Sequence, residues 1–146
     1  MSTDVRKPRQ FDEMLKKLCQ EDNKIFSTYK DALVFAACLG FDRQRRVPFD
    51  KDTERVRMEV FRGEFDTAIF HCIGIAETKN PAIMSSTMEQ ERVRIFEEYA
   101  NGGLEIIQSE VYAAGGQWDQ QLLALVVKQA KGRESVLADI TSAFSN

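Results

Sequence analysis

The sequence predicts a mainly α protein, a single compact helical domain of five or six helices that carries a small β-hairpin if two short segments pair. Apolar residues recur at helical spacing along most of the chain, and only one segment alternates with the two-residue period of a strand. At 146 residues and 43% hydrophobic composition, the chain is large enough to bury its own core. We expect a flexible charged N-terminal arm over residues 1–10, the helical domain over 11–132 and a C-terminal tail over 133–146.

The first two helices are predicted from apolar spacing and from a capping signature. In "FDEMLKKLC", Phe11 is followed by apolar residues at offsets of three, four and seven, which is one helical stripe. "EDNKI" at 21–25 interrupts the pattern. Thr28 followed by Asp31 resembles a capping box, and the apolar run that follows predicts a helix in the middle of the core. Gly40 fits the left-handed residue that commonly closes a helix.

The one candidate strand lies in "RVRMEVF" at 55–61. Here Val56, Met58 and Val60 alternate with charged residues, as in a half-buried strand. "RVPF" at 46–49 could pair with it across "DKDTE", and such a hairpin would have to pack on the helices to be stable.

Three further helices are predicted downstream. From Phe65, apolar residues recur at helical spacing as far as Ala76 and predict a helix that ends before "NP"; the others are Ala68, Ile69, Cys72 and Ile73. A second capping signature, Ser86 with Glu89, starts a long helical pattern that reaches Val111. "GG" at 115–116 breaks that pattern. The next helix begins near 118 and is expected to stop at Gly132. In the tail, Val136, Ile140 and Phe144 are spaced for a short amphipathic helix.

Composition narrows the class of protein. The net charge of -3 argues against a free-standing nucleic-acid binder, which usually carries a basic excess. The three cysteines are widely spaced and suit reduced thiols. The N-terminal segment has no apolar region typical of a secretory signal, and the longest wholly apolar run is far too short to cross a bilayer. We therefore expect a cytoplasmic protein with no membrane association.

No set of residues predicts catalysis. His71 and Cys72 are neighbours, but adjacent residues on a helix point about 100° apart, so a partly buried histidine is the favoured interpretation over a nucleophile pair. Phosphate-loop, nucleophile-elbow and metal-ligand motifs are missing from the sequence. The acidic pairs Glu89/Glu91 and Glu97/Glu98 are expected on a solvated helix face. We expect no enzyme activity, no catalytic residue, no metal and no cofactor.

Gly102 and Gly103 stand inside a helical pattern, where each costs about 1 kcal/mol relative to alanine. Something in the fold must offset that cost. Close approach of a neighbouring helix and a kink that divides the helix are the two structural explanations. The backbone of a partner, or a ligand, pressed against the glycines is the third.

The basic residues after the central helix suggest a second candidate site. Arginines there could cap the helix and form salt bridges, contact a partner protein, or join other arginines across the hairpin to bind the phosphates of DNA. Interleaved carboxylates would weaken such a patch. The five candidates are Arg43, Arg45, Arg46, Arg55 and Arg57, and the N-terminal Arg6, Lys7 and Arg9 could add to them.

Two stretches, "TYKDALVFAACLGFDRQRRVPF" and "IFEEYANGGLEII", resemble the DNA phosphorothioation-associated protein 4 family, also called the Dnd system-associated protein 4 family. The resemblance extends from about Arg6 to Val127. It implies a role in a bacterial system that marks DNA backbones with sulfur and restricts unmarked DNA, including phage DNA. It brings no catalytic residue to this chain.

The favoured hypothesis is an accessory or adaptor protein of such a system, acting through contacts with other proteins of the phosphorothioation and restriction cluster. The alternative is a small DNA-binding module that uses the arginine patch. An enzyme built on Cys72 and His71 is a distant third. The sequence leaves the oligomeric state open.

Overall fold

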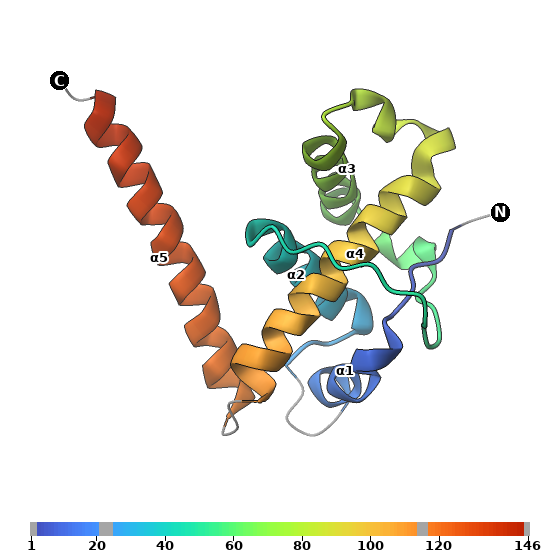
Figure 1. Ribbon diagram of the computed structural model, residues 1–146. Helices are drawn as coiled ribbons and strands as arrows, with labels where there is room; N and C mark the ends of the chain where they lie inside the picture. The colour runs from blue at the N-terminus through green and yellow to red at the C-terminus, as the bar shows by residue number, and fades with distance from the viewer. Residues whose placement is uncertain (1–2, 21–24, 114–116, 145–146) are drawn as a thin grey trace. The chain divides into compact units, whose positions relative to one another are not determined.

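The structure is a computed structural model that describes residues 3–20, 25–113 and 117–144, with side chains described outside 133–140 and 143–144. The mainly α fold is confirmed. In the described residues there are five α-helices joined by short helical turns and coil: α1 (Asp12–Cys19), α2 (Tyr29–Asp42), α3 (Glu64–Thr78), α4 (Glu89–Ile107) and α5 (Trp118–Phe144). Figure 1 shows their order along the chain.

The chain divides into two compact units, Met1–Ile106 and Ile107–Asn146. The first contains α1 to α3 and nearly all of α4. The second contains the π-helical turn η5 (Gln108–Tyr112) and α5. The division therefore falls at 106/107, whereas the sequence suggested one domain up to residue 132 and a separate tail.

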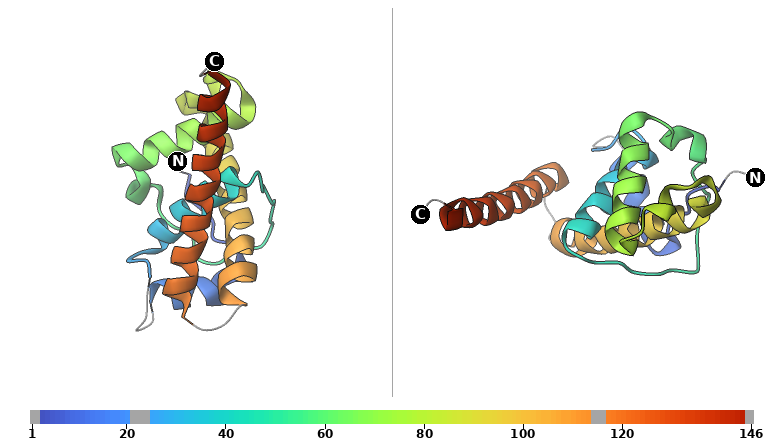
Figure 2. Two further views of the ribbon diagram at one scale, coloured as in Figure 1. Left: turned by 90° about the vertical axis from the view of Figure 1, so that its left-hand side faces the viewer. Right: turned by 90° about the horizontal axis from the view of Figure 1, so that it is seen from above.

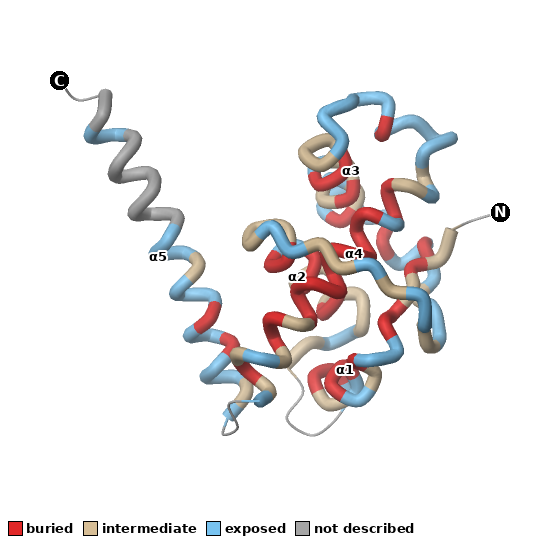
Figure 3. Tube along the Cα trace, in the orientation of Figure 1, coloured by how far each residue is buried: buried red, intermediate tan, exposed pale blue. Residues whose placement is uncertain are grey.

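Helix α4 is the centre of the first unit. Residues 92, 93, 95–104, 106 and 107 are buried, so burial extends round the whole circumference of the helix (Figure 3). Helices α2 and α3 lie on one side of α4, and the coil 43–57 crosses its opposite side (Figures 1 and 2). Phe96 of α4 stacks on Phe70 of α3 at 4.1 Å between ring centroids, and Phe61 meets both rings edge-on. These aromatic rings close the core between α3 and α4.

Glycines make the contact between α2 and α4. A Cβ on Gly103 would overlap the carbonyl group of Ala36 in α2, and a Cβ on Gly40 would overlap the Tyr99 carbonyl and lie 2.9 Å from the Gly103 nitrogen. Gly102 faces the Arg45 carbonyl in the same way. Gly102 and Gly103 thus lie where neighbouring backbone comes closest, and α4 continues through them without a break.

Gly40 does not close α2, contrary to the prediction. The helix runs on to Asp42, and the left-handed residue after it is Gln44, with φ of 56°. Gly40 is required inside the helix because the backbone of α4 occupies the space of a side chain. At the other end of α2 the capping prediction is confirmed, since Thr28 Oγ1 accepts a hydrogen bond from Asp31 N at 3.2 Å.

The predicted β-hairpin is wrong, and no strand occurs in the described part of the chain. Val47 donates its backbone N–H to the Glu98 carbonyl of α4 at 3.0 Å, so the 46–49 segment is not free to pair with 55–61. Val56 instead exchanges two 2.8 Å backbone hydrogen bonds with Val5, and Met58–Phe61 forms the 3-10 turn η2. The N-terminal segment takes the place expected for the second strand.

The residues expected in a flexible arm are packed against the first unit where they are described. Val5 is fully buried and Lys7 is 5% exposed. Arg9 N donates to the Lys51 carbonyl at 3.0 Å, and the bridge between Pro8 and Asp52 extends the contact. Residues 3–10 therefore belong to the helical unit.

The helix predicted from Phe65 is confirmed as α3, which buries only part of its apolar stripe. Its buried residues are Asp66, Phe70, Ile73 and Gly74. Phe65, Ala68 and Cys72, three of the six residues in this stripe, are exposed, and Phe65 is 73% exposed. Half of the stripe thus lies on the outside of the helix, while Ile73 is buried.

The second unit is built on α5, which runs through Gly132 to Phe144 instead of stopping there. The Tyr112 ring packs on Trp118 with centroids 4.9 Å apart, which links η5 to the first turn of α5. The predicted breaks at 21–24 and 115–116 lie outside the described residues, as do the side chains of Val136, Ile140 and Phe144.

Replacing Gly103 by alanine is expected to lower the free energy of unfolding of the first unit by about 2 kcal/mol or more. The added methyl group overlaps the Ala36 carbonyl, and overpacking outweighs the ~1 kcal/mol that alanine gains in helix propensity. Urea unfolding followed by circular dichroism measures the change. Gly63→Ala is the control, since no atom lies within 4 Å of a Cβ there, and it should change the value by less than about 1 kcal/mol. Equal effects of the two substitutions would contradict the close contact.

Candidate interaction surface

The structure does not bring the five candidate arginines together into a free cationic patch. Four of them are each paired with a different carboxylate. The pairs are Arg45 with Glu105 at 3.7 Å, Arg46 with Glu98 at 2.6 Å, Arg55 with Asp52 at 2.9 Å and Arg57 with Glu59 at 3.6 Å. Arg43 caps the end of α2 through its backbone N–H, which donates to the Leu39 carbonyl. The pairing of these four arginines agrees with the salt bridges that the sequence left open as one alternative.

Arg46 belongs to a polar cluster between the 43–49 coil, α3 and α4. Its Nε contacts Glu98 at 2.6 Å, and its Nη1 lies 3.8 Å from Glu77 of α3. The Tyr99 hydroxyl donates to the same Glu77 carboxylate. Burial, together with this hydrogen bond, raises the pKa of Tyr99 to about 12, so the hydroxyl keeps its proton at neutral pH. The cluster ties three segments of the first unit together.

The acidic pair Glu97/Glu98 is not on a solvated face, and that expectation is wrong. The two residues are 4% and 5% exposed. Each is buried because α4 is covered on all sides, and each has an arginine partner from another segment. A carboxylate that lacked such a partner would be strongly unfavourable in this position.

Arg6 is the partner of Glu97. Its backbone N–H donates to Glu97 Oε2 at 2.6 Å, its Nε donates to Oε1 at 3.0 Å, and its guanidinium lies over the Phe49 ring. Burial raises the pKa of Glu97 above its ordinary value, and the Arg6 hydrogen bonds and charge act in the opposite direction. The N-terminal segment is thereby fixed to the middle of α4.

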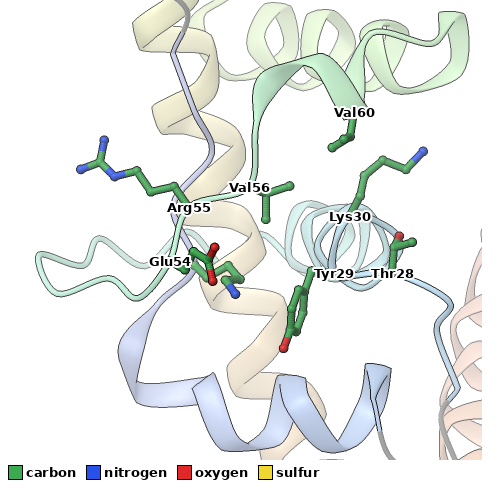
Figure 4. Close-up of a pocket in the computed structure, with 8 residues that line it drawn as sticks. Thr28, Tyr29, Lys30, Glu54, Arg55, Val56 and Val60 are labelled. Atoms are coloured by element: carbon green, nitrogen blue, oxygen red, sulfur yellow. The ribbon is translucent and has the colours of Figure 1, made fainter.

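A pocket of about 450 Å³ opens between the first turn of α2 and the 54–60 segment. Figure 4 shows Thr28, the N-cap of α2, with Tyr29 and Lys30 of the helix on one side and Val56 and Val60 on the other. Lys7 also lines the pocket. The walls are largely apolar, and charged groups stand mostly at the rim.

Lys7 is the unusual residue of this pocket. It is 5% exposed, and its ammonium lies 3.8 Å from the centroid of the Tyr29 ring. Within the described part of the chain, no carboxylate or carbonyl oxygen bonds to that ammonium. A cation over an aromatic ring gains about 0.5–2 kcal/mol, whereas an unpaired buried charge costs several kcal/mol. The cation–π contact therefore offsets only part of the cost.

The other two pocket cations already have partners. Lys30 Nζ bonds to Asp66 of α3 at 2.8 Å, and Arg55 Nε bonds to Asp52 at 2.9 Å. In Figure 4 the charged tips of both side chains point away from the space between α2 and Val56. Glu54 is exposed and stands at the rim.

His71 and Cys72 occupy neighbouring positions of α3. His71 is half-buried and Cys72 is exposed. Burial, with a smaller contribution from the nearby Arg92 charge, lowers the pKa of His71. Among the described residues, no three His, Cys, Asp or Glu side chains are grouped so that they could hold a metal ion.

None of the described helices combines the length and the apolar character that crossing a bilayer requires.

The family model described as DNA sulphur modification system-associated protein 4 matches residues 4–142. The chain belongs to this family. The matched range begins in the N-terminal segment that contacts α4 and ends within α5. It is longer than the range of about 6–127 over which the sequence resembled the family. No curated protein and no solved structure matches the chain. Family membership associates the protein with a DNA sulphur modification system.

Sequence reasoning missed the buried ion pairs of Glu97 and Glu98 in α4, and it missed the pocket at Lys7. A signal for the first was present, because Ile95, Phe96, Tyr99 and Ala100 surround the two glutamates with apolar residues on every side of the helix. The position of Lys7 depends on the N-terminal segment pairing with Val56, which no local pattern indicates.

Arg6→Met is expected to raise the pKa of Glu97 further, because the substitution removes the guanidinium hydrogen bond and charge that lower it. Carbon-13 NMR titration of the Glu97 carboxyl measures this pKa directly. Since the folded-state pKa of Glu97 lies above its unfolded value, its contribution to stability declines as pH rises from the unfolded pKa through the folded one. Arg94→Met is the control, because Arg94 contacts Glu91 and Glu98 and leaves Glu97 alone. An unchanged Glu97 midpoint in Arg6→Met would contradict this contact.

Proposed function

We propose that the protein is a non-catalytic adaptor of its DNA sulphur modification system, acting through contacts with other proteins of the same gene cluster. Family membership supports the link to the system. The proposal extends to restriction of unmodified DNA and so to defence against phage, in the cytoplasm. It assigns no reaction to His71 or Cys72, which diverge on adjacent positions of α3.

The outward face of α3 carries the proposal. Phe65, Ala68 and Cys72 follow one another at offsets of three and seven, and all three are exposed. Val60 of η2, 49% exposed, precedes them in the chain. Apolar side chains that gather on one helix face are typical of protein–protein interfaces, and an exposed aromatic ring is a frequent anchor.

The pairing of the arginines favours a protein partner over DNA. Each guanidinium that is held by a carboxylate must exchange that contact for a phosphate, which reduces the gain from binding. The net charge of -3 acts in the same direction because it repels the DNA backbone. A protein partner that binds the outward face of α3 requires no such exchange.

A tagged protein is expected to co-purify with proteins encoded by its gene cluster, and Phe65→Ser should reduce their recovery at least about tenfold, as for loss of a central aromatic anchor. Quantitative mass spectrometry of pull-downs from the native host measures this.

Met84→Ser is the matched control, because Met84 is also exposed, at 45%, but follows the opposite end of α3. It should leave recovery unchanged. If the unaltered protein captures no cluster protein under any condition, the adaptor proposal fails. If Phe65→Ser leaves the recovery of cluster proteins unchanged, the interface does not include the outward face of α3.

DNA binding by the arginines is the second candidate function, and the exposure of Arg57 (79%) and Arg55 (56%) is the observation in its favour. Because the patch is interrupted by carboxylates, we expect duplex binding to be undetectable at physiological salt. Fluorescence anisotropy with labelled duplex, over a salt series, tests this. Tight binding that weakens steeply with salt and disappears when Arg55 and Arg57 become alanine would establish the alternative.

A further inference from the structure

We propose that the pocket between Lys7 and the first turn of α2 binds a phosphate group, carried on a ligand whose uncharged part rests against the apolar wall. This site is separate from the outward face of α3, and it does not depend on the adaptor proposal.

The ammonium of Lys7 is the first observation. The residue is only 5% exposed. Its ammonium lies over the Tyr29 ring, and no oxygen atom in the described part of the chain accepts a hydrogen bond from it. The Cys19 thiol, whose pKa the Lys7 charge influences, stays neutral because burial raises that pKa to about 11. The Glu54 carboxylate also lines the pocket, but among the described residues it forms no ion pair with the ammonium. A buried cation in this position is stabilised when an anion enters beside it.

The start of α2 is the second observation. Thr28, Tyr29 and Lys30, which open the helix, all line the pocket (Figure 4). The Thr28 hydroxyl accepts from Asp31 N, but the amides of Tyr29 and Lys30 precede the first intrahelical bond. These amides and the positive end of the helix dipole favour an anion in the pocket that Lys7 also lines.

The shape and composition of the pocket indicate which anion. A volume of about 450 Å³ exceeds that of a bare ion, so the ligand has an additional part. Val56, Val60 and the Tyr29 ring offer that part an apolar surface. Helix amides and a three-donor ammonium together match the three terminal oxygens of a phosphate better than the two oxygens of a carboxylate.

Isothermal titration calorimetry on the full chain, at constant ionic strength, tests the site with inorganic phosphate, thymidine 5′-monophosphate and acetate. Saturable binding of both phosphate compounds is expected, with acetate at least about tenfold weaker. Tighter binding of the nucleotide identifies a nucleotide-like source, and equal binding identifies free phosphate. No saturable heat from either phosphate compound at millimolar concentration, or equal binding of acetate, overturns the proposal.

Three variants localise the site. Lys7→Met keeps the apolar stem and should weaken phosphate binding at least about tenfold. Lys51→Met, an exposed lysine outside the pocket, should leave it within about twofold because distant surface charges are screened. Glu54→Gln removes the rim carboxylate and should tighten binding about two- to fivefold. If Lys7→Met binds phosphate with wild-type affinity, the assignment is overturned. If Lys7→Met does not fold, the assignment is overturned when Glu54→Gln fails to bind phosphate more tightly.

Discussion

The close approach of α2 and α4 is the constraint on which the first unit depends. Gly40 and Gly103 remove the side chains that would otherwise separate the two backbones, and Gly102 lets the chain after α2 turn back across α4 at the Arg45 carbonyl. The unfavourable helix propensity of three glycines is therefore offset by the tight packing of backbone on backbone. Because the coil then runs directly over α4, Val47 can bond to the Glu98 carbonyl and Asn101 can bond to the Val47 carbonyl.

The position of α4 also determines what its charged residues do. Covered on every side, the helix holds Glu97 and Glu98 away from water, and each carboxylate takes an arginine from a segment far away in the chain. Pairing of this kind uses guanidinium groups to hold the fold together. The functions proposed above use other places, the apolar residues that α3 exposes and the pocket at the start of α2. The two places differ in chemistry, one suited to an apolar partner and the other to an anion.

Local patterns in the sequence predict the helices and the Thr28 cap and single out Gly102 and Gly103, because each depends on neighbouring residues. The role that they predict for Gly40 is wrong. They do not predict contacts between distant segments. The alternation at Val56, Met58 and Val60 resembles a strand, but its partner is the N-terminal segment, and only one bridge pair forms at Val56. The stripe from Phe65 has the spacing of a core face, yet aromatic packing of Phe70 on Phe96 turns α3 so that much of the stripe faces outward. The pocket at Lys7 follows from the same long-range pairing, so the sequence could not reveal it.

The contact between Arg6 and Glu97 joins residues 91 positions apart. During synthesis, the N-terminal segment leaves the ribosome long before its binding site on α4 exists, so Val5 and Lys7 stay in water until most of the chain has been made. Contacts of such long range are costly in loop-closure entropy and form late. Completion of the first unit thus coincides with the emergence of α4, and a nascent chain that stalls before this point cannot bury its amino end.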